Sequence, residues 1–309
     1  MKRKVIQLAR NTHVVTLPSS WMERFKIEKG DELNLEEINT DIIISTDKAC
    51  TEEQVEVDIS LLDKRTIMWI CSAMHKHGYN QIRLLYNDPK QIEFVRDRVK
   101  NLLTGFIIAD TTDKSMVLQS VSKDIESEFH PTLRRAFRVA LAMADETHQM
   151  LRNNDFSKKQ NVLELEVTNN QLTNFCQRLL NKRGFKEYNK TTFYYVIAWN
   201  LEKICDNYKY IIEDLSSSEQ SEPIPPGTLN FLKQCNDYFT GYYELLYDYN
   251  AEKLLVLSRK RDSLKELKNI IHPSSYLEIK LVSHMFTLFT QITDFSAAII
   301  AVNTNTKNS

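Results

Sequence analysis

Short alternating runs of apolar and polar residues dominate the start of the chain and predict strands rather than long helices there. The expected elements of this region are four strands, at residues 5–8, 13–17, 31–36 and 41–45, with the last two forming a hairpin around Asn39 and Thr40. Between the second and third strands, Ser20 and Glu23 have the spacing of a capping box at the start of a short helix. Gly30 then supplies the positive φ of the turn that follows.

This first region is too small to be stable alone. Four short strands and one small helix expose much unpaired strand edge and bury little apolar surface. We therefore predict that a second copy of the chain completes its core, which makes the protein a homodimer.

The pattern changes between residues 54 and 122, where strands alternate with helices. Strands are predicted at residues 55–59, 81–86, 106–109 and 116–119, and helices at residues 61–76 and 89–103. This order is typical of a small α/β domain. The chain has only six glycines, and none has the spacing of a phosphate-binding loop, so nucleotide chemistry is not expected here.

From residue 125 to 303 the apolar residues recur at helical spacing. Six helices are predicted, at residues 133–151, 161–180, 191–215, 228–249, 251–271 and 274–302. Residues 216–227 have the composition of a linker and divide these helices three and three. We predict an α+β multidomain protein with domains at residues 1–48, 54–122 and 125–303, the last an all-α pair of three-helix bundles.

Aromatic residues are dense in the helices at 191–215 and 228–249. They have helical spacing and few basic neighbours, which favours a bundle core over a platform for stacking nucleic-acid bases. These residues are Phe193, Tyr194, Tyr195, Trp199, Tyr208, Tyr210, Tyr238, Phe239, Tyr242, Tyr243, Tyr247 and Tyr249.

Composition bounds the class of protein. With 42% hydrophobic and 26% charged residues, the chain is globular. No secretory signal is expected from its first residues, and its five cysteines, at 50, 71, 176, 205 and 235, include no C-x-x-C pair, which suits a reducing cytoplasm. The most apolar window, residues 281–302, contains His284, Gln291 and Asp294, so we predict a buried bundle helix and no membrane insertion.

Positive charge is concentrated at the start of the chain. The formal net charge is −1, yet residues 1–30 hold seven basic and two acidic side chains. This asymmetry indicates an anion-binding end on a neutral or acidic body.

The motifs of this end resemble one known family. Lys2-Arg3-Lys4-Val5-Ile6-Gln7-Leu8, Thr16-Leu17-Pro18-Ser19-Ser20-Trp21 and Lys29-Gly30-Asp31-Glu32 together resemble the SpoVT/AbrB-type swapped-hairpin DNA-binding domain. The resemblance implies that two copies interleave their hairpins into one β-barrel that binds DNA. On this basis Lys2, Arg3, Lys4 and Arg10 are the expected DNA-binding residues, with phosphate contacts dominating the affinity. The chain departs from many relatives at residues 9–12, where they have a Gly-rich loop.

The helical region resembles the PhoU family of phosphate-uptake regulators, especially archaeal members with an AbrB-like domain in front. The resemblance covers residues 125–303, and its matching stretches are Val162-Leu163-Glu164-Leu165-Glu166 and Leu201-Glu202-Lys203-Ile204-Cys205-Asp206-Asn207. Relatives can bind a divalent or iron-type metal ion through E/D-x-x-x-D pairs, since carboxylates four residues apart share a helix face.

The metal motifs of that family are degenerate in this chain. Only Glu202 and Asp206 keep the pair, whereas Glu166 has Asn170 as its partner and Asp294 has Thr290. The four candidate metal ligands are Glu166, Glu202, Asp206 and Asp294. Acidic residues four apart also arise by chance on helix surfaces, so a solvated helix face is the alternative.

These features predict a cytoplasmic, homodimeric DNA-binding regulator of transcription, and not an enzyme, because no candidate nucleophile has a partnered base in the sequence. The resemblance implies that the regulated process is phosphate uptake or phosphate homeostasis. The alternative is a PhoU-like adaptor that docks on a phosphate transporter or sensor and uses its first domain only to dimerise. A third hypothesis is a regulator that has left phosphate control for other genes.

Overall fold

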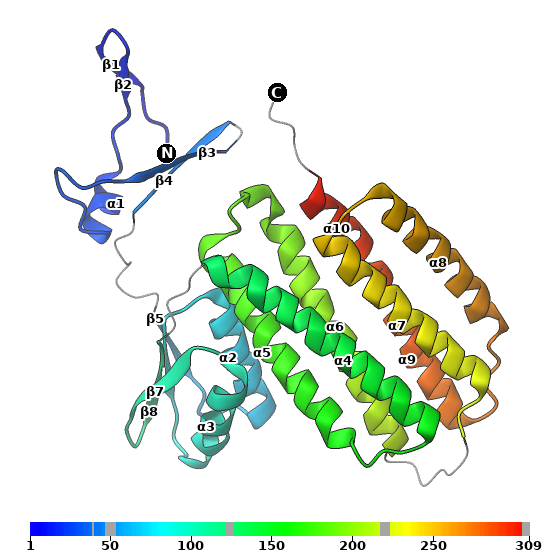
Figure 1. The fold of residues 1–309 in the computed structure, drawn as a ribbon. Helices are drawn as coiled ribbons and strands as arrows, with labels where there is room; N and C mark the ends of the chain where they lie inside the picture. Colours follow the sequence, from blue (N-terminus) through cyan, green and yellow to red (C-terminus); the bar gives the residue numbers. More distant parts are fainter. Residues whose placement is uncertain (39, 47–53, 122–125, 217–222, 305–309) are drawn as a thin grey trace. The chain divides into compact units, whose positions relative to one another are not determined.

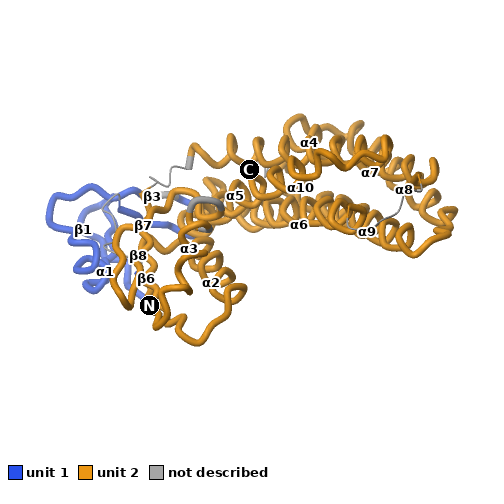
Figure 2. The backbone as a smooth tube through the Cα atoms, turned by 90° about the horizontal axis from the view of Figure 1, so that it is seen from below, with its two compact units in different colours: residues 1–54 blue, residues 55–309 orange. Residues whose placement is uncertain are grey.

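The computed structural model describes residues 1–38, 40–46, 54–121, 126–216 and 223–304. The chain divides into two compact units, residues 1–54 and 55–309 (Figure 2). The fold mixes α and β structure and is mostly helical, as the sequence predicts at the level of fold class. The second unit contains both the predicted α/β region and the predicted helical region. Asn39, the Cys50 thiol and residues 217–222 of the predicted linker lie outside the described residues.

The first unit consists of two hairpins and a short helix (Figure 1). Its elements are β1 (Ile6–Ala9), β2 (Thr12–Val14), α1 (Ser19–Arg24), β3 (Asn34–Ile38) and β4 (Asp41–Ser45). β1 pairs antiparallel with β2, and β3 pairs antiparallel with β4, so the described residues of this unit form two separate two-stranded sheets and no closed barrel. Each hairpin forms from neighbouring residues, because its second strand follows its first after a short turn.

The predicted capping box of α1 is wrong. The helix begins at Ser19 with Pro18 at the N-cap, which makes no side-chain hydrogen bond, so Ser20 already lies inside the helix. The carbonyl of Pro18 accepts the backbone N–H groups of Trp21 and Met22 instead. The prediction for Gly30 is confirmed, because its φ is +102°.

The α/β region follows the predicted order of elements. These are β5 (Gln54–Asp58), α2 (Lys64–His77), β6 (Gln81–Leu85), α3 (Lys90–Leu102), β7 (Phe106–Thr111) and β8 (Ser115–Ser120). The four strands form one sheet in the order β5-β6-β8-β7, with β8 antiparallel to both of its neighbours. Asp63 accepts the backbone N–H of Thr66 and so starts α2, and Gly78, with φ +111°, ends it. In this region the capping residues of α2 and the alternation of apolar residues therefore indicate the same element boundaries.

The helical region contains seven helices in the described residues. They are α4 (Phe129–Asn153), α5 (Lys159–Arg183), α6 (Thr191–Ser216), α7 (Pro226–Tyr247), α8 (Ala251–Ile270), α9 (Tyr276–Thr293) and α10 (Phe295–Asn303), with short 3-10 turns at Glu126–Glu128 and Tyr188–Lys190. The last predicted helix is therefore two, broken at Asp294. The apolar period hides this break, because Ile292, Phe295 and Ile299 are all buried.

The helices do not form two bundles with separate cores. One continuous hydrophobic core includes buried residues from α4 through α10. α6 packs against α4 and α5 on one side and against α9 and α10 on the other, so the two groups of three share it (Figure 1). Adjacent residues of α6, such as Asn200 with Leu201 and Ile204 with Cys205, are both buried, so burial extends further around this helix than one narrow stripe.

The aromatic residues of α6 and α7 are partly in this core. Tyr208, Tyr238 and Phe239 are fully buried, which confirms the prediction for them. Phe193, Trp199 and Tyr210 are 38%, 46% and 43% exposed, and for these three the prediction is wrong. They lie on the outer side of α6.

The span Tyr276–Asn303 is apolar and long enough to cross a membrane by length and composition alone. It comprises α9, α10 and the break between them. In this structure its buried side chains, among them Met285, Leu288 and Ile299, belong to the helical core.

Helix α5 packs against the α/β region and joins it to the helical region. Helices α2 and α3 lie between the sheet and α5 (Figures 1 and 2). The guanidinium of Arg178, which has no exposed surface, donates to the carbonyls of His75 and Tyr79 at 2.9 and 2.8 Å and to Asn80 Oδ1 at 3.1 Å. It also stacks over Phe106 at 5.0 Å from the ring centre. These bonds satisfy the carbonyl end of α2, which explains why the two regions form one unit.

Candidate nucleic-acid interface and acidic cluster

The four predicted DNA-binding residues lie at the two ends of the β1–β2 hairpin. Lys2, Arg3 and Lys4 belong to the extended segment before β1, and Arg10 is in the turn between the strands. All four side chains are exposed. Gln7 Nε2 donates to the Arg10 carbonyl at 3.1 Å, which holds the turn.

The hairpin does not gather these charges at one point. Arg10 follows Lys4 by six positions, and a strand rises by about 3.3 Å per residue, so about 20 Å separates the two ends. Two groups of cations this far apart can contact phosphates at separate points of one duplex, whereas one small anion could reach only one of the groups. The geometry therefore suits a polyanion.

Apolar side chains of the same unit have almost no cover. Val5, Leu8, Leu35 and Ile42 are 65%, 70%, 68% and 62% exposed. Among the residues of this unit whose burial is described, only Ile27 is buried. Such a set of exposed apolar strands marks an interaction surface.

The acidic residues predicted from the second resemblance do meet, but around two lysines. Lys203 Nζ lies 3.2 Å from Glu202 Oε1 and 3.1 Å from Asp206 Oδ2. Lys209 Nζ lies 2.6 Å from Glu166 Oε1 and 3.0 Å from Asp206 Oδ1. Two ammonium groups from α6 thus form ion pairs with three carboxylates from α5 and α6.

Electrostatics holds these lysines in the charged form. Burial alone would lower the pKa of Lys209, but hydrogen bonds from Lys209 to Glu166 and Asp206 outweigh it and raise that pKa well above its usual range. Burial also opposes the charge of Lys203, and the nearby Glu202 and Asp206 raise its pKa in the same way. Ammonium groups occupy the positions where a cation would bind.

The fourth candidate ligand, Asp294, is exposed at the junction of α9 and α10. In the described parts of the chain, no group of three or more His, Cys, Asp and Glu side chains is arranged to hold a metal ion. One buried side-chain oxygen each of Asn170, Asn174 and Glu202 has no hydrogen-bond partner. These oxygens, on α5 and α6, could still accept hydrogen bonds. The arrangement favours an ion-pair network over a metal centre.

Sequence reasoning missed the two lysines, although their spacing was visible. Each is three residues from Asp206 along the helix, and residues three apart share a helix face. A motif defined by carboxylates alone ignores the cations between them.

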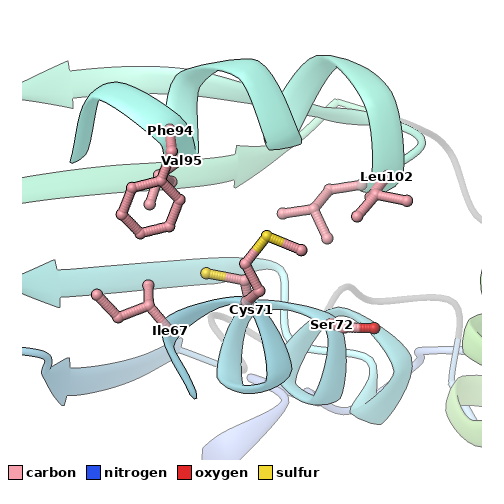
Figure 3. A pocket seen from close by; sticks show the side chains of 8 residues that line it. Ile67, Cys71, Ser72, Phe94, Val95 and Leu102 are labelled. Atoms are coloured by element: carbon pink, nitrogen blue, oxygen red, sulfur yellow. The ribbon is translucent and has the colours of Figure 1, made fainter. Parts of the chain in front are cut away.

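A small apolar crevice lies between α2 and α3 (Figure 3). It is lined by Ile67 and Cys71 from α2 and by Phe94, Val95 and Leu102 from α3, and its volume is only about 10 Å³. That volume admits one water-sized group and no ligand. Burial raises the pKa of the Cys71 thiol to about 12, so this thiol is not a ready nucleophile.

Replacement of Lys209 by Met is expected to lower the free energy of unfolding by about 2 kcal/mol, because it leaves the buried Glu166 carboxylate without its closest cation. Urea unfolding measures this loss. Lys233→Met is the matched control, since the Lys233–Asp237 pair is largely exposed and contributes less than about 1 kcal/mol. Equal stability of Lys209→Met and the parent would contradict the network.

The same pair predicts a pH dependence. A raised pKa means that the folded state binds the proton of Lys209 more tightly than the unfolded chain does. Its stabilisation is therefore fully present below the ordinary pKa of 10.5 and is lost as the pH rises through the higher folded value. The difference between parent and Lys209→Met should be constant near neutral pH and shrink in strong alkali.

No family model matches this chain, and neither does any curated protein or solved structure with which it was compared.

Proposed function

We propose that the protein is a homodimeric DNA-binding regulator of transcription. The observation that carries the proposal is the first unit, in which uncovered apolar strands adjoin a basic hairpin. The resemblance of its motifs to the SpoVT/AbrB-type domain supports the same function.

The apolar strands support dimerisation. A second copy supplies equally apolar hairpins, and a symmetric pair can bury Leu8, Leu35 and Ile42 of both chains in one shared core. A swapped-hairpin barrel is the arrangement that we propose. It also pairs strand edges that the single chain leaves open.

The basic hairpin supports DNA as the partner. Dimerisation doubles Lys2, Arg3, Lys4 and Arg10 to eight cations, each able to neutralise one phosphate and release a counterion. Contacts to phosphates position a protein on the duplex, and base contacts then add specificity.

The second unit then supplies the input of the regulator. Its resemblance to the PhoU family supports phosphate supply as the signal. The five cysteines, which include no C-x-x-C pair, suit a reducing cytoplasm as the location. Because α5 fastens the α/β region to the helices through Arg178, a change in one region would reach the other as a rigid movement.

One observation favours the adaptor alternative. Phe193, Val196 and Trp199 are 38%, 46% and 46% exposed and follow each other at three-residue spacing along α6. Such a row is suited to a protein partner, for example a phosphate transporter or sensor. In that case the first unit dimerises without binding DNA specifically.

Alanine at Lys2, Arg3, Lys4 and Arg10 together is expected to abolish tight binding to DNA. The slope of log affinity against log salt should fall by about 0.9 per phosphate contact, or about 7 for a dimer that loses all eight. Fluorescence anisotropy with a promoter duplex and a random duplex at two salt concentrations measures both effects.

The matched control replaces four exposed basic residues of the second unit, Lys158, Lys159, Arg259 and Lys265, with alanine. It removes the same charge and should leave affinity and salt slope nearly unchanged. Unchanged DNA binding in the hairpin variant would refute the assignment and favour the adaptor.

A further inference from the structure

A cleft of the helical region lies where three helices meet. The start of α7, the end of α8 and the start of α9 gather at one end of the bundle (Figure 1). The cleft between them has a volume of about 330 Å³, which is within the range of small-molecule sites. Leu267, Ile270 and Ile271 provide an apolar wall, and Asn230 and Glu278 provide polar groups.

The carboxylate of Glu278 is the distinctive group of this cleft. The residue is 8% exposed. Its Oε1 accepts from Thr228 Oγ1 at 2.9 Å, and its Oε2 accepts from the backbone N–H and the hydroxyl of Ser274 at 2.8 and 3.0 Å. These bonds tie the start of α9 to the start of α7.

Within the described residues, every donor to this carboxylate is neutral. Burial alone would raise the pKa of Glu278, but the hydrogen bonds from Ser274 and Thr228 outweigh it and lower that pKa, so the group is ionised at neutral pH. Buried charges in proteins are generally paired. Here a negative charge lies on the wall of a cleft that His272 also lines, and among the described residues no lysine or arginine side chain donates to it.

We propose that this cleft binds a small alkylammonium compound, with its ammonium group on the Glu278 carboxylate and its hydrocarbon chain against Leu267, Ile270 and Ile271. The inference does not depend on the DNA-binding function, because it involves only the second unit.

The geometry favours an ammonium over a metal ion. Three of the hydrogen-bonding positions of the carboxylate are already used, so few remain for an ion that needs six or more oxygen ligands. An ammonium N–H needs only one of them, and the Asn230 side chain supplies a further polar contact. The apolar wall matches a hydrocarbon chain and has nothing to offer a hydrated ion.

Gly227 allows the cleft to be closed without touching the carboxylate. A Cβ built at this residue meets no heavy atom within 4 Å, and its φ is not in the left-handed region. Because Gly227 lines the cleft, we expect leucine at this position to fit the backbone and to narrow the cleft.

Isothermal titration of the full chain with n-butylammonium chloride tests the proposal, and n-butanol is the uncharged probe. We expect one butylammonium per chain, no matching binding of butanol, and at least about tenfold weaker affinity in Glu278→Gln and in Gly227→Leu. Glu252→Gln is the control, since Glu252 also lies in the first turn of a helix but is exposed and outside the cleft.

Three results would overturn the proposal: no binding of butylammonium, equal binding of butanol, or unchanged affinity in Gly227→Leu. Glu278 would then be a structural clamp between α7 and α9 only. If Glu278→Gln fails to fold by circular dichroism, Gly227→Leu still decides, because it keeps the clamp intact.

Discussion

Replacement of Ile42 by Glu is expected to convert the dimer to monomers. Ile42 is 62% exposed on β4 within the chain, and in the proposed dimer it packs in the shared core. A carboxylate buried there without a partner costs several kcal/mol, enough to dissociate the pair at micromolar concentration. Sedimentation velocity measures the change in mass.

The control for this variant is Leu61→Glu. Leu61 is 96% exposed and lies in the second unit, so the same change in charge and polarity should leave the dimer intact. If Ile42→Glu remains a dimer, the prediction is contradicted. If Leu61→Glu then dissociates, the interface lies in the second unit.

Replacement of Arg178 by Met is expected to lower the free energy of unfolding by about 3 kcal/mol. The methionine keeps much of the packing, but the carbonyls of His75 and Tyr79 and the amide oxygen of Asn80 lose this donor while buried or half-buried. Urea unfolding gives the loss, and hydrogen exchange should increase at the C-terminal end of α2, where the bonds are made.

Arg183→Met is the matched control, because Arg183 is an exposed arginine near the end of the same helix. It should change stability by no more than about 0.5 kcal/mol. Equal stability of Arg178→Met and Arg183→Met would contradict the account of how α5 holds the α/β region.

Periodicity predicted most elements of the second unit because each has one strong pattern. The helix that begins at Ala251 and the strand that begins at Gln81 start where the apolar spacing indicates. The ends of elements were predicted less well. For example, β2 stops at Val14, although the apolar pattern continues to Leu17. Backbone pairing, and not residue type, decides where such a strand ends.

The features that the sequence did not predict depend on tertiary contacts. The break at Asp294 leaves the apolar period intact, so only packing reveals it. A single core in place of two bundles follows from the burial of α6 on opposite sides, and one helix pattern does not say which neighbours cover it. The capping box predicted for Ser20 and Glu23 does not form, because the helix begins at Ser19 with Pro18 at the N-cap.

The candidate sites divide in the same way. The basic residues at the start of the chain are visible as a local excess of charge. Arg178 and Glu278 are single charged residues whose importance lies in what distant segments place beside them. Lys203 and Lys209 are only partly predictable from the sequence. Their spacing from Asp206 is local, but the ion pair of Lys209 with Glu166 joins two helices.

The most direct test of the central claim is sedimentation velocity of the full chain with a fluorescent duplex from the promoter of its own gene, at two salt concentrations. The account predicts a complex of one duplex with two chains, whose affinity decreases steeply as salt increases. A monomeric protein, or a dimer that leaves the duplex unbound even at the lower salt concentration, would contradict it.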